Sequence, residues 1–523
     1  MSLKISDISE LSKKYRSMLF AAAFLLVAAA VFIKLNGYGF SSLTGGAAAF
    51  HTAVVLACIV GAVIALPFLH KLSVEKNFLV IWTLLSMVYM FSGTVFKAPD
   101  ETGHFYRSYE ISVGGVVSEV QEGTGQGGRE LPLDVDLTLL ENSWQSFSEN
   151  KGMTLTENEP FLVFTNLSLY CPVSYLPQSA GIFVARHLTD NIAAIAYAGR
   201  VTNWLVITLV LFFAIKVIPM KKELLMLFSL LPMNIYESTS LSPDGLVVAV
   251  AFLMFAYVLH LRFVQKDKLK FGQYVLLYVM ALAISLLKIV YLPICMIYFL
   301  IPAERFGSTN KKLIHAAVMA LLAVGSNLVW LSICKKFLTI PGTDANEQLR
   351  YILHDPINYV VVMVRTAVHS AERWALMMIG GYLGALNIET SKLLALVYLL
   401  MLVIAFIDLP RVAAWRKAGK SGETAEKTVW SENIIFGVIV FAIIMLINAS
   451  IYLQWTPPHS DMIKGIQGRY FIALLPPLYF ALHNPTKVFS DSQSENKTVT
   501  VSAEYLILFI NVCAGIDVLL ACL

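Results

Sequence analysis

The chain contains 523 residues, of which 57% are hydrophobic and 14% are charged, and its mean hydropathy is +0.69. Soluble domains carry about 25% charged residues, so the composition excludes a soluble protein and indicates an integral membrane protein. The formal net charge of +4 is small and the basic residues are scattered over loops, which argues against a nucleic-acid partner. Six cysteines occur without a C-x-x-C motif, so neither a disulfide framework nor a zinc site is expected.

The apolar segments are long and do not alternate with polar residues, which predicts transmembrane helices. A span needs about 20 residues, and we expect an all-α, polytopic fold with about thirteen spans. Four basic residues precede the first span and place the N-terminus in the cytoplasm, which puts the C-terminus outside. The expected spans lie near 17–36, 47–69, 78–96, 192–215, 223–236, 244–264, 272–287, 289–301, 313–334, 390–409, 432–454, 470–483 and 504–522.

Two polar segments interrupt the spans. Loop 97–191 follows the third span and is too long for a simple connection. Its glycine-rich middle, 114–159, predicts a flexible surface segment, and 170–181 predicts an interfacial helix. Segment 335–389 contains amphipathic stretches and a re-entrant piece over 374–387. The expected regions are 1–96 (N-terminal spans), 97–191 (an extracytoplasmic loop with an acidic motif and interfacial helices), 192–334 (central spans), 335–389 (a second extracytoplasmic, amphipathic segment) and 390–523 (C-terminal spans).

Lys288 lies in the middle of the apolar run 272–301, beside Tyr291 and Pro293. An ammonium group at mid-bilayer costs at least ~2.5–3.5 kcal/mol on insertion scales. Two short helices in place of one long helix would put Lys288 at the outer surface or in a wet cavity. We therefore predict that the helix breaks at this residue.

The stretch KAPDETGHFYRSYEI, residues 97–111, begins where the third span ends. Pro99 favours a turn, and Asp100 is placed to be the N-cap of the helix that follows. Counted from Asp100, His104 and Arg107 fall on one face of that helix. The pattern predicts either a capped, solvated helix at the membrane surface or a site that combines carboxylates, an imidazole and a guanidinium.

Costly polar groups recur at the outer face of the predicted topology. Asp244 opens the sixth span as a helix N-cap would, Lys288 can snorkel, and Arg469 can bind lipid phosphate. If these residues serve one reaction with Asp100, their spans must pack side by side around one cavity, open to the outer surface and to lipid. Further candidates lie beside them in the sequence: Glu101, Tyr291, Gln467 and Tyr470.

Adjacent carboxylates beside cationic groups at a membrane surface suit transfer from a phosphate-linked donor to a hydroxyl acceptor. A carboxylate can deprotonate the hydroxyl, or Asp100, Glu101 and His104 can bind a divalent cation, Mg or Mn. Lys and Arg side chains can neutralise a leaving phosphate, and apolar spans can hold a polyprenyl chain. The same acids could also act without a metal.

Five motifs occur in order: FKAPDETGHFYRSYEIS, YCPVSYLPQSAG, LSPDGL, LLKIVYLP and GIQGRYFIALLPP. Together, from Phe96 to Pro477, they resemble a bacterial family of large predicted membrane proteins of unknown function that is related to the GT-C glycosyltransferases. The resemblance implies a GT-C-like fold, a lipid-phosphate-linked sugar donor, an acid pair in the first large outer loop and an inverting transfer outside the membrane. By this likeness Asp100 and Glu101 are the catalytic pair. They follow the third span rather than the first, so two extra N-terminal spans are implied.

The sequence therefore predicts a glycosyltransferase of a bacterial cytoplasmic membrane, which moves a sugar from polyprenyl phosphate to a cell-surface glycan on the extracytoplasmic face. Its partners would be the polyprenyl-phosphate sugar, the glycan acceptor and membrane lipids. One alternative is a transporter or flippase for a lipid-linked glycan, which would need polar groups along a path across the membrane; another is a glycan polymerase or ligase. The expected substrate- and phosphate-binding residues are His104, Arg107, Asp244, Lys288, Tyr291, Gln467, Arg469 and Tyr470.

Overall fold

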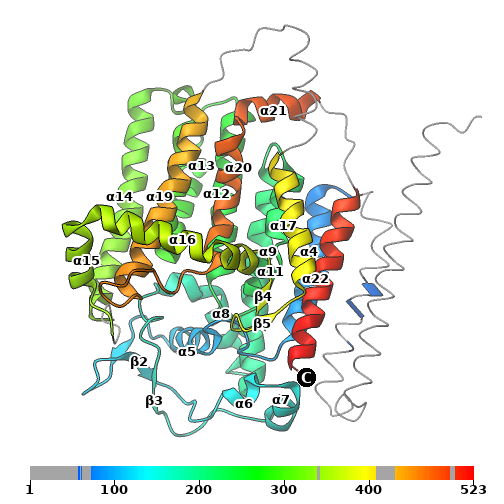
Figure 1. Cartoon of the computed structure of the whole chain (residues 1–523), viewed down its shortest axis with the longest axis vertical. Coiled ribbons are helices and arrows are strands. Elements are labelled where there is room, and N and C mark those ends of the chain that lie inside the picture. The colour runs from blue at the N-terminus through cyan, green and yellow to red at the C-terminus, as the bar shows by residue number, and fades with distance from the viewer. Residues whose placement is uncertain are drawn as a thin grey trace, which may run out of the picture.

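The computed structural model describes residues 72–337, 342–407, 430–494 and 501–522, together with the isolated positions 53, 57, 58, 60 and 61. Long helices run side by side in a bundle, and a lobe of short helices and strands lies at one end of it (Figure 1). The span expected near 17–36 lies outside the described residues, as does most of the span expected near 47–69.

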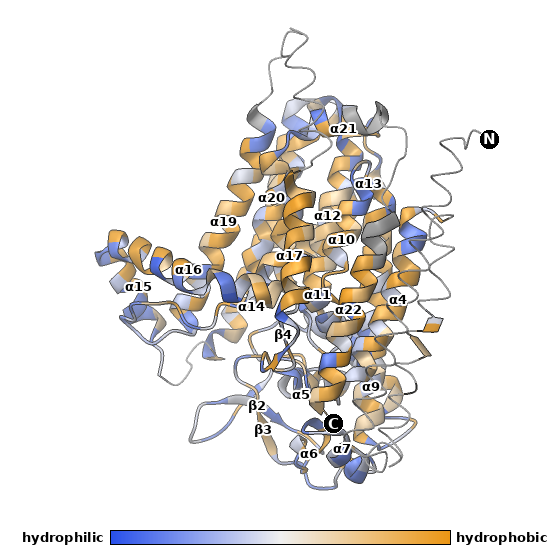
Figure 2. Ribbon diagram, turned by 45° about the vertical axis from the view of Figure 1, so that its right-hand side comes forward, coloured by the Kyte–Doolittle hydropathy of each residue, from blue (hydrophilic) through white to orange (hydrophobic). Residues whose placement is uncertain are grey.

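The bundle is that of a multi-pass membrane protein, and apolar residues dominate its long helices (Figure 2). Most of the predicted spans in the described ranges correspond to helices, while the total of thirteen stays a prediction. Five described helices are long and apolar enough to cross a bilayer: α4 (Val74–Ser92), α9 (Ile192–Val217), α12 (Asp244–Phe263), α14 (Thr309–Cys334, continued by η4, Lys335–Phe337) and α19 (Trp430–Gln454). Shorter apolar stretches are α13 (Phe271–Leu287), η2 (Ile289–Leu300), α17 (Lys392–Ile407), η5 with α20 (Gly468–Leu474 and Leu475–Leu482) and the part Leu506–Cys522 of α22 (Val501–Cys522).

The core of the bundle is built around α12, which is buried along most of its length against α9, α13 and η2. A helix that is apolar on all sides is expected to lie inside a protein. Because α12 begins at Asp244, this carboxylate is carried on the end of the most enclosed long helix.

One predicted span is interrupted, and one predicted break between spans is observed. The expected helix over 223–236 is instead two short helices, α10 (Lys222–Ser229) and α11 (Pro232–Ser238), because Pro232 has no N–H with which to continue the hydrogen-bond ladder. The predicted break at Lys288 is confirmed, since α13 ends at Leu287 and η2 begins at Ile289. η2 is a 3-10 helix of 12 residues, which is unusually long for this type.

Loop 97–191 forms the lobe. Strands β1 (Glu119–Val120), β2 (Gly127–Glu130) and β3 (Phe161–Val163) make an antiparallel sheet in that order, with Gly128 opposite Glu119 and Val163. A Cβ at Gly128 would lie 1.9 Å from the carbonyl oxygen of Leu162, so only glycine allows this approach. The prediction of a flexible segment over 114–159 is therefore wrong. The helices of the lobe are α5 (Glu101–Ser112), α6 (Thr138–Glu141), α7 (Trp144–Asn150), η1 (Pro172–Tyr175) and α8 (Leu176–Ala185).

The predicted amphipathic stretch in segment 335–389 is confirmed as a helix. α16 (Pro356–Met378) follows the shorter α15 (Ala345–His354) and lies across the long helices rather than along them (Figure 1). Its side chains Ile357, Val364 and Val368 are exposed. Over 374–387, where a re-entrant piece is expected, the end of α16 leads to a hairpin of β4 (Tyr382–Leu383) and β5 (Ile388–Glu389). Two further short helices are η3 (Ala303–Phe306) and α21 (Pro485–Ser494).

Candidate functional site

Asp100 lies where the chain leaves α4 and enters α5. Its backbone is left-handed, with φ 57° and ψ 16°, a conformation that Asp adopts more readily than most residues. Asp100 is the N-cap residue of α5, as predicted, but its carboxylate makes no capping hydrogen bond. Instead this carboxylate is 67% exposed and lies 3.8 Å from the Arg469 guanidinium.

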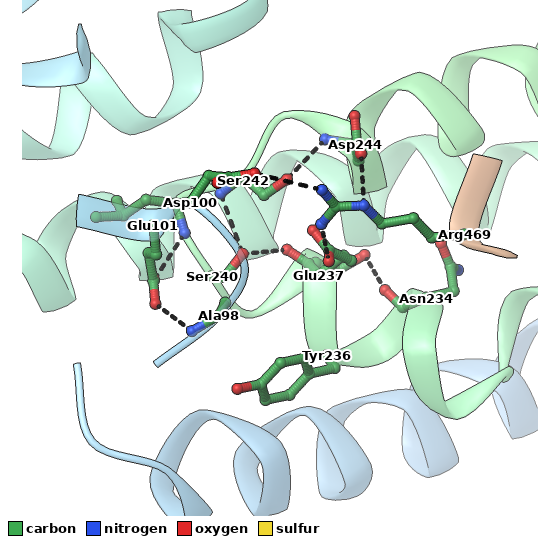
Figure 3. A network of polar contacts seen from close by, with 12 residues as sticks. Ala98, Asp100, Glu101, Asn234, Tyr236, Glu237, Ser240, Ser242, Asp244 and Arg469 are labelled. Carbon is green, nitrogen blue, oxygen red and sulfur yellow. Dashed lines mark hydrogen bonds and ion pairs between the residues drawn. The ribbon is translucent and has the colours of Figure 1, made fainter. Parts of the chain in front are cut away.

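Arg469 joins three carboxylates at the centre of the site (Figure 3). Its side chain is 5% exposed and forms an ion pair with Glu237 of α11, while its Nε lies 3.3 Å from Oδ2 of Asp244. Gly468 allows this placement, because a Cβ there would lie 1.9 Å from the carbonyl oxygen of Trp374 on α16. The start of η5 is thus held tightly against α16, and Arg469 is held with it.

Lys288 lies at the break between α13 and η2 and contacts the same group of carboxylates through Asp244. Its Nζ donates to Oδ1 of Asp244 at 3.0 Å and lies 4.4 Å from the ring centroid of Tyr470. The Tyr291 hydroxyl donates to the carbonyl oxygen of Tyr470 at 2.9 Å, which ties η2 to η5. These contacts confirm the prediction that Asp100, Asp244, Lys288 and Arg469 meet. We call these four residues and Glu237 the charged cluster.

Glu101 lies next to Asp100 but has different surroundings. It is 1% exposed, and both carboxylate oxygens accept hydrogen bonds from Arg200 of α9, at 2.7 and 2.6 Å. The same oxygens accept from the backbone N–H groups of Leu241 and Ala98, at 3.0 and 3.1 Å. Glu101 therefore links α5, α9 and the loop before α12, and its position favours organisation of the site over contact with a substrate.

The loop before α12 is fixed by further polar side chains. Asn203 of α9 donates to the carbonyl oxygens of Ser240 and Ser242, at 2.9 and 3.0 Å. The Ser242 hydroxyl accepts from the backbone N–H of Asp244 at 3.2 Å. Buried backbone groups need such partners, and here they hold the first turn of α12, and with it the Asp244 carboxylate, in one position.

His104 and Arg107 do not join the charged cluster as ligands. His104 is 4% exposed and shares a hydrogen bond of 2.8 Å with the Tyr175 hydroxyl. Arg107 is fully buried, forms an ion pair with Glu110, and donates to the carbonyl oxygen of Tyr170 at 3.2 Å. Asp100 precedes α5 with a left-handed backbone, and its carboxylate is exposed, whereas the side chains of His104 and Arg107 are buried.

His104 is expected to make stability depend on pH. Burial, opposed by Asp244 and assisted by Arg469 and Lys288, lowers its pKa from 6.5 to about 3. Between these two values the unfolded chain binds a proton that the folded chain does not, so stability falls as the pH drops below about 6.5, by up to ~1.4 kcal/mol per pH unit. The melting temperature of the wild type should fall more steeply from pH 7 to 4.5 than that of His104→Gln. Equal slopes would contradict the assignment.

The proposed metal ligands do not fit a divalent cation as they are arranged. Both oxygens of Glu101 are occupied by Arg200 and backbone N–H groups, so this carboxylate has no free oxygen for a cation. Asp100 alone of the three has an exposed carboxylate. Among the described residues, no group of three His, Cys, Asp or Glu side chains is placed to bind a metal.

Sequence reasoning missed Glu237. Glu237 lies in the apolar stretch LLPMNIYES, where an acid is costly and suggests a functional or paired group. The position of Arg200 inside a span predicts a structural partner for an intramembrane acid, which the structure identifies as Glu101. Arg200 is only 4% exposed. Of the remaining candidates, Tyr470 lies beside Lys288, and Gln467 is half-buried, with an Oε1 that has no hydrogen-bond partner among the described residues.

The sequence was compared with known families, curated proteins and solved structures. A family described as predicted membrane protein (DUF2142) matches residues 82–478. No curated protein and no solved structure matches the chain. The family match covers most of the bundle, the lobe and every residue of the charged cluster.

Proposed function

We propose that this chain, which belongs to the DUF2142 family of predicted membrane proteins, is an inverting GT-C-type glycosyltransferase that moves a sugar from a polyprenyl-phosphate donor to a glycan acceptor. The observation that carries the proposal is the exposed Asp100 carboxylate 3.8 Å from Arg469, with Lys288 on the other side of Asp244. This arrangement combines a candidate base with two candidate phosphate-binding groups at one end of a membrane bundle.

Arg469 and Lys288 supply donors for the phosphate of the donor lipid. An ammonium group has three N–H donors, and Lys288 uses one of them on Asp244. A guanidinium has five N–H donors. The guanidinium of Arg469 pairs with Glu237 through Nη1, whereas its Nη2 lies 3.8 Å from Asp100, too far for a hydrogen bond. The carboxylates Asp244 and Glu237 hold these cations in place, and the unused N–H groups can bind phosphate oxygens.

Asp100 is the base in this mechanism. Its carboxylate accepts the proton of an acceptor hydroxyl as the hydroxyl oxygen forms a bond to the anomeric carbon of the donor sugar. The bond between that carbon and the phosphate oxygen breaks on the opposite side, which inverts the configuration. The electron pair leaves on polyprenyl phosphate, whose added charge is stabilised by Lys288 and Arg469.

In this proposal the charged cluster faces the extracytoplasmic side of a bacterial cytoplasmic membrane, where polyprenyl-linked sugars meet cell-surface glycans. The donor's lipid chain remains among the helices, so its phosphate must reach the cluster sideways from the bilayer. Cysteines placed singly in the lobe of a variant that lacks the six native cysteines would test the orientation. They should react with a membrane-impermeant maleimide on intact cells; labelling only after lysis would reverse it.

The direct test is turnover by the purified full-length chain. Polyprenyl-phosphate sugars labelled in the sugar, presented in liposomes with envelope glycan as acceptor, should give labelled glycan and free polyprenyl phosphate. Asp100→Asn, reconstituted in equal amount, is the matched control. Absence of transfer across a panel of hexose, pentose and amino-sugar donors would remove the enzyme proposal.

One observation favours a transporter as the second candidate. α10 and α11 are the two halves of a broken helix, and Glu237 lies buried on the second half; discontinuous helices with buried charges are typical of substrate sites in transporters. Labelled lipid-linked glycan placed in one leaflet of a proteoliposome separates the two functions. Movement to the other leaflet without cleavage of the sugar–phosphate bond would support transport.

Chelation is expected to leave the transferase activity unchanged. Both oxygens of Glu101 are engaged with Arg200, so the acid next to Asp100 offers no second free oxygen ligand. Turnover should therefore be the same before and after dialysis against EDTA, and added Mg or Mn should not raise it. If turnover is lost on dialysis and restored by added Mn or Mg, the reaction requires a divalent cation.

A further inference from the structure

A polar cavity of about 360 Å³ lies in the lobe beside the C-terminal end of α5. Its volume is within the range of small-ligand sites, about 300–1,000 Å³. It is lined by the end of α5 with the turn after it, by residues 129–132 at the end of β2, and by Glu159 and Arg186. It contains no residue of the charged cluster, which lies toward the other end of α5.

Arg186 lines the cavity and contacts the C-terminal end of α5. Its Nη2 donates to the carbonyl oxygen of Ser112 at 3.1 Å, where the helix dipole favours a cation. The Nε of Arg186 is buried and has no hydrogen-bond partner among the described residues. Buried N–H groups without a partner are costly, and this cost accompanies the placement of Arg186 at the wall of the cavity.

Arg129 forms the facing wall. It pairs with Glu119 at 2.7 Å and lies 3.8 Å from Glu110. Gly115 packs closely beside it, because a Cβ at that position would lie 2.9 Å from the carbonyl oxygen of Glu110 and 2.0 Å from Nη1 of Arg129. Both arginines are held by contacts to other residues of the lobe, and pre-organised donors reduce the cost of binding.

The lining combines opposite charges and a phenol. Arg129 and Arg186 contribute two positive charges, and Glu130 and Glu159 contribute two negative ones, so a polyanion would meet repulsion at the carboxylates. Saccharide hydroxyl groups both donate and accept hydrogen bonds, and they match such a mixture of guanidinium, carboxylate and phenol. Tyr109 also brings an aromatic ring to the cavity.

We propose that this cavity binds a saccharide segment of the acceptor glycan through its hydroxyl groups. The inference rests on the proposed function, because it names the second point at which the acceptor is held. Tyr109 and Asp100 are nine residues apart, about 14 Å along a helix at ~1.5 Å per residue. An oligosaccharide can extend over that distance and a monosaccharide cannot, so the enzyme should prefer an oligosaccharide acceptor.

The test uses an occluding variant and a matched control. Val113 lines the cavity and is 43% exposed, whereas Val116 is three residues further on, 58% exposed, and is not part of the lining. Val113→Trp should fill the mouth of the cavity, and Val116→Trp adds the same bulk to the same loop. Both variants retain every charged side chain, and their melting temperatures and size-exclusion profiles check the fold.

The probe is a printed array of neutral, uronic-acid-bearing and sulfated oligosaccharides, to which the solubilised full-length chain is applied. The wild type should bind neutral oligosaccharides, Val113→Trp should bind them at least about tenfold more weakly, and Val116→Trp should bind as the wild type does. Absence of binding to any oligosaccharide, equal binding by Val113→Trp, or binding to sulfated chains alone would overturn the inference.

The array also separates this inference from the proposed reaction. Asp100→Asn should bind oligosaccharides like the wild type, because Asp100 does not line the cavity. Binding on the array without any transfer would support the saccharide site and contradict the proposed transferase activity. If Val113→Trp leaves transfer to both monosaccharide and oligosaccharide acceptors unchanged, the saccharide site is contradicted and the transferase activity is supported.

Discussion

Asp100→Asn is expected to lower turnover by ~10²-fold or more, the usual contribution of a general base, while the protein folds and inserts normally. Asn keeps the size of the side chain and tolerates the left-handed backbone that Asp100 adopts. The wild-type carboxylate is 67% exposed and only 3.8 Å from Arg469, so little stabilisation is lost with its charge. Turnover, melting temperature and yield from membranes measure the effect.

Asp190→Asn is the matched control for this substitution. Asp190 is an exposed residue of the same lobe, away from the charged cluster, and its neutralisation should leave turnover unchanged. Wild-type turnover by Asp100→Asn would exclude Asp100 as the base. A similar loss in both variants would show that the lobe as a whole responds to a lost charge.

Arg469→Met should be the most destabilising single change in the charged cluster. It leaves the Glu237 carboxylate, 3% exposed, without its guanidinium partner. Removal of one member of a buried ion pair typically costs about 3–5 kcal/mol, because the remaining charge is uncompensated. Thermal unfolding in detergent should show this loss, and turnover should fall with it because the phosphate-binding group is gone.

The double variant Arg469→Met with Glu237→Gln separates stability from function. It removes the uncompensated charge, so much of the stability should return, whereas turnover should stay lost. Arg365→Met is a control, because its pair with Asp461 is 51% and 79% exposed and such pairs contribute about 0–1 kcal/mol. Full turnover in the double variant would exclude Arg469 from phosphate binding.

The meeting of Asp100, Asp244, Lys288 and Arg469 could be predicted from sequence because a charged group is costly inside a bilayer. Each lies at a helix end or a break, and the expected topology places these ends at the same face. Most of the spans followed from apolar length alone. The break at Lys288 followed from the cost of a buried ammonium, so a local argument was sufficient there.

The roles of neighbouring residues could not be predicted in this way. Glu101 follows Asp100 directly, yet its partner is Arg200, 99 residues further along the chain, and no local pattern identifies such a pair. The helical face assigned to Arg107 assumed that the helix begins at Asp100 with regular dihedral angles. A positive φ at that residue changes the direction of the chain before α5 starts.

The glycine-rich part of the lobe was misjudged for a related reason. Low hydrophobicity and many glycines favour flexibility when each residue is considered alone. At Gly128 and Gly115, however, glycine is favoured because a backbone carbonyl oxygen lies in or close to the space of a Cβ. Close approach between segments is a tertiary property, so composition could not distinguish it from disorder.

The 3-10 form of η2 makes the length of this segment matter as well as its composition. A 3-10 helix has three residues per turn and rises ~2.0 Å per residue. Tyr291, Ile294, Ile297 and Leu300 therefore form a straight row, and all four are buried. Removal of one residue from η2 would turn the segment before the deletion by about a third of a turn and shift it by ~2 Å relative to the rest. Lys288, at the head of that row, would then point away from Asp244, so an indel in this apolar segment should be as damaging as a substitution at Lys288 itself.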